Sequence, residues 1–251
     1  MQKNAELNWV RLPLEGVENC RELGGYGTGN GRQVNWRRFL RSSDLHELTV
    51  NDTLFLEEYG LKTVIDLRGA DEVALRPNPL AETRFCDYYN IPFSGQPVLE
   101  LSMAEDAFMG DFYVTLLEES NAVKQMFDTI SLAKEGAILF HCAAGKDRTG
   151  ILTMLLLGLV GVEKKDIVSN YEVTYTNLES LQGKINSEII TKKIPSSFLY
   201  SSREYIFYAY DHIIDKYESF DNYLQMKNIE QEVIERVKER LESKVGEVLI
   251  P

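Results

Sequence analysis

The sequence predicts an α/β fold in which a central, mostly parallel sheet is flanked by helices and the C-terminal half is helical. Two observations support this prediction. Short apolar stretches alternate with helical patterns up to residue 149, and beyond it apolar residues recur only at helical spacing. Of the 251 residues, 44% are hydrophobic, enough to bury a substantial core. Because no repeat or linker divides the chain, we expect residues 1–251 to form a single domain.

The first half of the chain carries two of the predicted strands. Residues 24–34, GGYGTGNGRQV, are typical of a turn or hairpin, because glycine reaches positive φ without steric strain. A helix is expected from Thr49, a suitable N-cap, to about residue 59, with Gly60 as its stop. A buried strand is predicted at residues 61–69, LKTVIDLRG, and a second strand-like stretch, FCDYYNI, lies within 84–92 and is ended by a proline.

The second half is expected to contain one strand and several helices. Residues 94–111 lack periodicity, which predicts a long loop of the kind that often serves as a lid. Helical spacing at 112–133 ends before the apolar run 137–140, a predicted central strand. Further helices are expected at 166–181, 202–217 and 229–243, and Pro195 interrupts the run between the first two.

Composition excludes several classes of function. A net charge of −12 argues against a general nucleic-acid binder, so no nucleic acid is expected as a partner. Three widely spaced cysteines fit neither a disulfide framework nor a metal knuckle, and we expect Cys20 and Cys86 to be core residues. The longest apolar run, 151–162, is too short for a membrane span, and the N-terminus lacks an apolar signal segment. These features predict a cytoplasmic protein without stable membrane insertion, and secretion stays open as the alternative.

Residues 137–157, AILFHCAAGKDRTGILTMLLL, hold the pattern that points to chemistry. An apolar strand runs into Cys142, and a short loop then leads into an apolar helix. Ligands of α/β proteins bind at such loops, beyond the carboxyl end of a strand. The small residues Ala143, Ala144 and Gly145 allow the backbone to curl so that several N–H groups point inward. Such a nest at a helix N-terminus binds anions, and phosphate fits it.

Cys142 and Arg148 flank this nest and suit a covalent mechanism. The Arg148 guanidinium can hold two phosphate oxygens at once. A helix N-terminus with nearby cations lowers a thiol pKa from about 8.5 to roughly 3.5–7.5, so we expect a thiolate that attacks phosphorus and forms a cysteinyl-phosphate. Lys146 adds positive charge that favours substrates with several phosphates, and Thr149 is placed to donate its hydroxyl to the sulfur.

The leaving group of this reaction needs a proton from a carboxylic acid. Asp147, inside the loop, is the first candidate. Asp66, which ends the strand VID, and Asp106 or Asp111 in the lid-like segment are further candidates, because a neighbouring strand end or a closing loop also presents an acid. We expect His141 to be structural, since a thiolate produced by the nest needs no general base.

Other interpretations of these motifs fit less well. The glycines of 24–34 do not lie between a strand and a helix, as a dinucleotide fingerprint requires. The Gly-Lys pair at 145–146 is not part of a nucleotide-binding P-loop, because Asp147 stands in place of the required serine or threonine. Arg68 is expected to act structurally, as a cap partner of Glu72 or as a support for the site.

The loop HCAAGKDRTG resembles the signature of the cysteine-based protein-tyrosine phosphatase superfamily, and its GKDRTG form is similar to the bacterial PtpB-type group of tyrosine and dual-specificity phosphatases. The resemblance extends to NCRELGGY at 19–26, RSSDL at 41–45, VIDLRG at 64–69 and YESFDNYL at 217–224. It therefore spans nearly the whole chain. The sequence departs from the group's pattern at Cys20, Glu22 and Ala143, changes that bear on substrate preference.

The resemblance implies a phosphatase fold with Cys142 as nucleophile, Arg148 as the phosphate-binding residue and Asp147 as the loop acid. It implies activity on phosphotyrosine, on phosphoserine or phosphothreonine, and on phosphoinositides, with inorganic phosphate as product and no metal or cofactor. A phosphorylated protein or a phosphoinositide is thus the expected partner. The alternative hypothesis is a catalytically silent module that binds phosphate and sequesters a partner.

Overall fold

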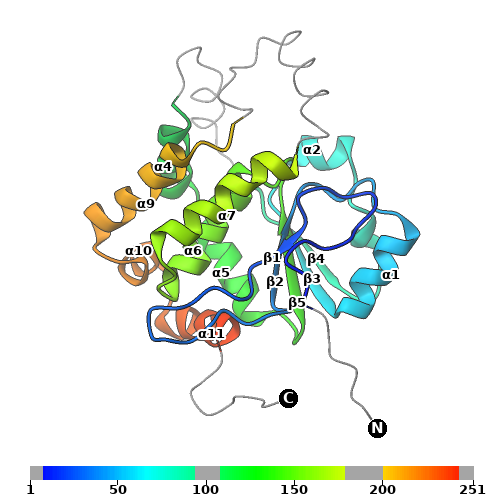
Figure 1. Ribbon diagram of the computed structural model, residues 1–251, viewed down its shortest axis with the longest axis horizontal. Coiled ribbons are helices and arrows are strands. Elements are labelled where there is room, and N and C mark those ends of the chain that lie inside the picture. Colours follow the sequence, from blue (N-terminus) through cyan, green and yellow to red (C-terminus); the bar gives the residue numbers. More distant parts are fainter. Residues whose placement is uncertain (1–7, 94–107, 179–199, 243–251) are drawn as a thin grey trace.

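The computed structural model describes residues 8–93, 108–178 and 200–242, and these residues contain a five-stranded sheet (Figure 1). Its strand order is β1-β2-β5-β3-β4, and β1 alone runs antiparallel to its neighbour. In that order the strands are Arg21–Glu22, Phe39–Ser42, Ala137–His141, Leu61–Asp66 and Asp87–Asn90. The predicted α/β class with a mostly parallel sheet is confirmed.

Helices cover both faces of the sheet, so apolar residues of its central strands are buried on both sides. On one face, α1 (Val50–Tyr59) packs a core that includes Leu56 and Val64. On the other face, the larger core joins Ile65 of β3 to the helices of the second half. Figure 1 shows α1 on one side of the strands and α4, α6, α7 and α9 on the other.

The remaining helices mostly follow the predicted pattern. The capping box of Thr49 with Asp52 starts α1, and Gly60, at φ +93°, ends it, as predicted. The other helices are α2 (Ala70–Leu75), η1 (Pro79–Glu82), α4 (Met109–Glu119), α5 (Ala122–Leu132), α6 (Asp147–Leu159), α7 (Lys164–Asn177), α9 (Arg203–Tyr217), α10 (Phe220–Met226) and α11 (Gln231–Leu241). None of the helices in the described ranges is long and apolar enough to cross a membrane.

Two predictions for the middle of the chain need correction. The single helix expected at 112–133 is a pair, α4 and α5, because Ser120 adopts an extended conformation and its hydroxyl accepts the N–H of Ala122. The predicted lid loop 94–111 is wrong for residues 109–111, which belong to α4. Residues 94–107 lie outside the described residues, as do Pro195 and the end of the helix expected at 166–181.

All four parallel strands end at the same edge of the sheet. Ser42, Asp66 and Asn90 end β2, β3 and β4, and His141 ends β5. His141 is paired in register with both Ser42 and Asp66. The segment that follows His141 therefore emerges between two neighbouring strand ends, where α/β proteins bind ligands.

Candidate active site

The loop between β5 and α6 is held by its carbonyl groups. The backbone N–H of Asp44 donates to the carbonyl of Ala143 at 2.9 Å. The Asn19 amide donates to the carbonyls of Ala144 and Gly145 at 3.0 and 3.1 Å. In a trans peptide the N–H points opposite to the carbonyl, so the N–H groups of residues 144–146 turn to the other side of the loop. Three successive amides are thus free to act as an anion nest, whose binding of phosphate stays a prediction.

Gly145 is the residue that makes this curve feasible. Its φ is +66°, and a Cβ there would lie 2.3 Å from the carbonyl oxygen of Ser42. Only glycine combines a left-handed backbone with such a close approach to the neighbouring strand. Lys146 then serves as the N-cap residue of α6. The Lys146 side chain is 3% exposed, and its Nζ lies 3.4 Å from Asp147.

Cys142 and His141 lie at the start of the loop. The Cys142 thiol is free, and the residue is 2% exposed. Burial lowers the pKa of His141, so the imidazole is neutral. Its Nε2 lies 3.0 Å from the Asn78 amide, and its Nδ1 lies 3.1 Å from the Cys142 carbonyl. Both ring nitrogens are thus engaged in shaping the loop, which agrees with a structural role.

Arg148, in the first turn of α6, is directed by an acidic partner from α2. Its two terminal nitrogens contact Glu72 at 2.6 and 2.9 Å. Burial alone raises the pKa of Glu72, but the Arg148 guanidinium brings it below its ordinary value. The expected partnership between Arg68 and Glu72 is replaced by this pair, because Arg68 binds Asp66 instead. Glu72 therefore fixes Arg148 beside the loop.

Asp147 and Thr149 face the interior at the N-terminus of α6. The Tyr113 hydroxyl donates to Asp147 Oδ1 and lies 2.6 Å from the Tyr171 hydroxyl. The Asp147 side chain is 19% exposed. Thr149 is fully buried, and its hydroxyl has no hydrogen-bond partner within the described part of the chain. The structure shows no contact between this hydroxyl and the Cys142 sulfur, so its predicted role stays a prediction.

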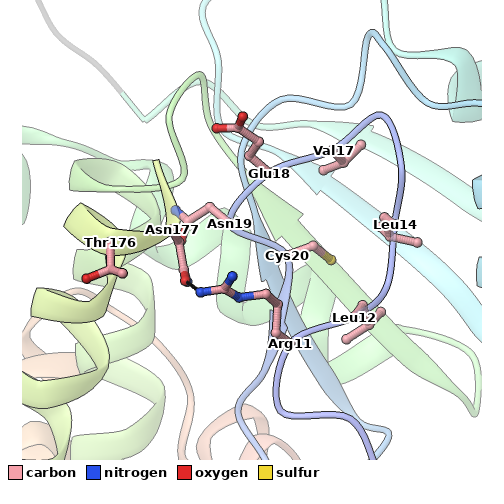
Figure 2. A pocket seen from close by; sticks show the side chains of 9 residues that line it. All are labelled: Arg11, Leu12, Leu14, Val17, Glu18, Asn19, Cys20, Thr176 and Asn177. Atoms are coloured by element: carbon pink, nitrogen blue, oxygen red, sulfur yellow. Dashed lines mark hydrogen bonds between the residues drawn. The ribbon is translucent and has the colours of Figure 1, made fainter. Parts of the chain in front are cut away.

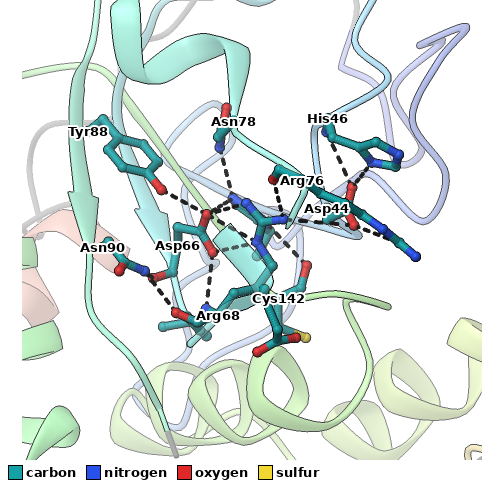
Figure 3. Close-up of polar contacts among 12 residues, drawn as sticks. Asp44, His46, Asp66, Arg68, Arg76, Asn78, Tyr88, Asn90 and Cys142 are labelled. Atoms are coloured by element: carbon teal, nitrogen blue, oxygen red, sulfur yellow. Dashed lines mark hydrogen bonds and ion pairs between the residues drawn. The ribbon is translucent and has the colours of Figure 1, made fainter. Parts of the chain in front are cut away.

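Asp66 lies at the centre of the polar network in Figure 3. Three groups donate to its carboxylate: the Arg68 guanidinium, the Arg68 backbone N–H and the Tyr88 hydroxyl. Burial alone raises the pKa of Asp66, but the hydrogen bonds from Arg68 lower it below the ordinary value. An ionised, fully buried carboxylate has no proton to give to a leaving group. Asp111 lies in the first turn of α4, and Asp106 lies outside the described residues.

The pH dependence of stability tests this placement of Asp66. Because its folded-state pKa is lowered, its stabilising effect is fully present above the ordinary carboxyl pKa and is lost as pH falls through the folded value. We expect Asp66→Asn to lower the free energy of unfolding at pH 7 by about 3–5 kcal/mol, since Arg68 keeps a buried charge without its partner. The difference from wild type should narrow below about pH 4. Urea unfolding at several pH values measures both effects.

The matched control is Asp87→Asn in the neighbouring strand. Asp87 pairs with Lys134 at the surface, so this change should leave the free energy of unfolding nearly unchanged. Equal destabilisation by the two variants would contradict a special role for Asp66.

A groove of about 510 Å³ adjoins the back of the loop. It is lined by residues of segment 11–20 and by the end of α7, and Figure 2 shows Asn19 between these two walls. Asn19 lines the groove and also binds the loop carbonyls, whereas Cys142 is not among the lining residues. The groove therefore flanks the anion nest without containing it.

Three contributions to the site are absent from the sequence-based interpretation. Asn19 holds the loop carbonyls, Glu72 fixes Arg148, and Tyr113 contacts Asp147. Asn19 lies within NCRELGGY, a stretch that carries the family resemblance but had no role assigned to it. Nothing in the local pattern around Glu72 or Tyr113 indicates these contacts.

Comparison with known proteins identifies the family of the chain. A sequence model described as the tyrosine phosphatase family matches residues 12–243. The tyrosine-protein phosphatase of Nostoc commune is 43% identical over 145 residues, which cover 56% of this chain and 49% of that protein. The triple specificity protein phosphatase PtpB of Mycobacterium tuberculosis is 25% identical over 271 residues, which cover 90% of this chain and 96% of that protein.

Among solved structures, TpbA of P. aeruginosa is a distant match, with a TM-score of 0.29 and 17% identity over 54% of this chain and 68% of that chain. The chain spans about half the length of the Nostoc relative.

Proposed function

The chain belongs to the tyrosine phosphatase family, and from this premise we propose that it hydrolyses phosphotyrosine, and phosphoserine or phosphothreonine, in proteins through a cysteinyl-phosphate on Cys142. One observation carries the proposal. Donors from other segments hold the carbonyls of residues 143–145, an arrangement that supports three N–H groups turned toward a bound phosphate, and Glu72 binds Arg148 next to this loop. A nest of that composition suits a phosphate dianion.

The first step transfers the phosphoryl group to sulfur. The Cys142 thiolate attacks phosphorus, the P–O bond to the leaving oxygen breaks, and Asp147 gives that oxygen a proton. The nest N–H groups and Arg148 stabilise the charge on the three equatorial oxygens. Both described contacts of the Asp147 side chain, from Tyr113 and Lys146, fall on Oδ1, so we assign the transferred proton to Oδ2.

The second step regenerates the enzyme. Water attacks the phosphorus of the cysteinyl-phosphate, Asp147 accepts a proton from that water, and the S–P bond breaks to release thiolate and inorganic phosphate. The Thr149 hydroxyl, which lacks a partner within the described ranges, is assigned to the departing sulfur.

Trapping the intermediate tests the proposal directly. Acid quenching during turnover of an aryl phosphate should give one phosphate per chain, bound to the peptide that contains Cys142, with a burst of phenol of the same amplitude. A silent phosphate-binding module, the alternative hypothesis, would bind phosphate and give neither burst nor adduct. Absence of both signals in folded protein would overturn the proposed function.

The role of Asp147 predicts a dependence on the leaving group. Asp147→Asn should slow phenyl phosphate, a poor leaving group, by roughly 10²–10³-fold, because the phenoxide then departs without a proton. An activated ester such as dinitrophenyl phosphate needs little protonation and should be slowed far less. Steady-state kcat/KM for a series of aryl phosphates gives the comparison.

Asp111→Asn is the control for this series, because Asp111 is a second candidate acid, on α4. It should leave both substrates near the wild-type rate. Equal slowing of good and poor leaving groups by Asp147→Asn would assign the proton transfer to another residue.

We propose phosphoinositides as a second substrate class. Lys146 supports this proposal, because its ammonium group is held next to the nest and adds charge for a second phosphate. A panel of phosphotyrosyl peptide, phosphoseryl peptide and phosphoinositide should show turnover of all three. Lys146→Met should then lower kcat/KM for the phosphoinositide more than for the phosphotyrosyl peptide, and equal losses would remove the support.

A further inference from the structure

We propose that Arg41 is a positioning residue whose buried charge keeps the Cys142 sulfur ionised, and that the neutral Asn170 side chain preserves this charge for the site. The proposal rests on the proposed function, in which Cys142 reacts as a thiolate. It concerns two residues that touch neither the substrate nor the reacting sulfur by any contact in the structure.

Arg41 lies directly beneath the loop. It belongs to β2, which pairs with β5, and it is in register with Phe140, two residues before Cys142. Its side chain is fully buried. One terminal nitrogen donates to the Gly145 carbonyl at 2.7 Å, and the other donates to Asn170 Oδ1 at 2.7 Å. The guanidinium thus joins the loop to α7.

These contacts leave the charge of Arg41 without a carboxylate. Among the described residues no aspartate or glutamate forms an ion pair with it, and its Nε is buried without a partner. Its neighbour across the sheet, Arg21, is also buried and donates to neutral oxygens of Asn19, Asn170 and Thr174. A buried guanidinium without an anion is unfavourable by several kcal/mol, so such an arrangement calls for an explanation.

The surroundings of Arg41 indicate which anion its charge stabilises. Burial lowers the pKa of Arg41 to about 10, and the charge of Cys142 is the largest influence that opposes this shift. Electrostatic attraction is mutual, so a cation that is stabilised by the thiolate also stabilises the thiolate. The nearby carboxylates already have partners: Asp147 is bound by Tyr113 and Lys146, Glu72 by Arg148, and Asp66 by Arg68. The other titratable groups around the guanidinium are Arg21 from β1, Tyr26 from the turn, Tyr113 from α4 and Tyr171 from α7. The buried His141 beside the sulfur is neutral.

Asn170 provides a test that separates charge from packing. In Asn170→Asp the new carboxylate would occupy the Oδ1 position, 2.7 Å from Arg41, and the Tyr26 hydroxyl, now 3.2 Å from the amide nitrogen, could donate to the second oxygen. The contacts are kept, and a buried cation gains a partner. The variant should therefore fold at least as stably as wild type. Its carboxylate should also cancel the influence of Arg41 on Cys142.

The readout is the pH dependence of Cys142 alkylation by iodoacetamide, followed by mass spectrometry of the Cys142 peptide. We expect the midpoint of the alkylation profile to rise by about one pH unit in Asn170→Asp, the size of effect that a nearby charge has on a titration. Ser169→Asp, on the exposed adjacent position of α7, adds the same net charge and should leave the midpoint unchanged. Asn170→Ala should lower stability without raising the midpoint to the same extent. An unchanged midpoint in folded Asn170→Asp would overturn the proposal.

Arg41 itself provides a second pair of variants if Asn170→Asp fails to fold. Arg41→Gln keeps a donor for the loop but removes the charge, whereas Arg41→Lys keeps the charge. The midpoint should rise in the glutamine variant and stay near wild type in the lysine variant, and equal midpoints would contradict the proposal.

Alkylation does not require turnover, so the two hypotheses can fail separately. A wild-type protein that forms no cysteinyl-phosphate overturns the proposed function. If wild type forms the cysteinyl-phosphate but the midpoint of Cys142 alkylation is the same in Asn170→Asp, only the role of Arg41 is overturned.

Discussion

Cys142→Ser is expected to abolish turnover of aryl phosphates, with a loss of at least about 10⁴-fold in kcat. A serine hydroxyl stays protonated at neutral pH and needs a general base to attack phosphorus. The nearest histidine, His141, is not available for that task, because its two nitrogens face the Asn78 amide and the Cys142 carbonyl. The rest of the loop does not depend on the sulfur, since Asn19 and Asp44 hold it through backbone carbonyls.

Because Cys142→Ser should affect turnover but not phosphate binding, the two are measured separately. Steady-state turnover of p-nitrophenyl phosphate should vanish in Cys142→Ser, while titration calorimetry with inorganic phosphate should give a Kd close to that of wild type. Cys86→Ser is the matched control, because Cys86 is also buried, and its sulfur lies within hydrogen-bonding distance of Thr83 and the Leu80 carbonyl rather than of the β5–α6 loop. It should keep full activity. Turnover at the wild-type rate in Cys142→Ser would rule out a cysteine nucleophile.

The sequence predicts those parts of the fold that follow from local patterns. Strand β5 is an apolar run up to His141, and β3 is recognised by Val64, Ile65 and the following Leu67, so the predicted ranges lie close to the observed ones. Strand β2, FLRS, is not predicted, because Phe39 and Leu40 are followed at once by polar residues. Those polar residues, Arg41 and Ser42, are nevertheless fully buried, since they lie beneath the loop. Because the residues of β2 that support the loop are polar, a search for apolar runs does not find this strand.

The candidate site shows the same division. Cys142, Asp147 and Arg148 lie within seven residues, so one local pattern points to all of them. The groups that hold them come from distant segments: Asn19 is 125 residues from Ala144, and Glu72 is 76 residues from Arg148. These residues are far apart in the sequence and meet only in the folded protein, where the sheet topology brings the strand ends together. Local spacing carries no information about such partners.

Gly145→Ala is expected to produce the second large loss, and it tests the nest itself. The left-handed backbone at φ +66° destabilises alanine by about 1–2 kcal/mol. In addition, the new Cβ would lie 2.3 Å from the Ser42 carbonyl oxygen. Ser42 cannot move aside easily, because it is paired with His141 in the sheet. The loop must therefore shift away from β2. Its N–H groups should then no longer converge on one bound phosphate.

We expect kcat/KM of Gly145→Ala to fall by about 10²-fold or more, the scale on which a displacement of roughly 1 Å affects catalysis. Gly31→Ala is the matched control: Gly31 has a similar φ of +78°, but no atom lies within 4 Å of the position of its Cβ. It should lose stability from the backbone strain alone and keep full activity. Thermal unfolding together with aryl phosphate kinetics separates the two variants. If Gly145→Ala were as active as Gly31→Ala, the close approach of the loop to β2 would not be what shapes the phosphate nest.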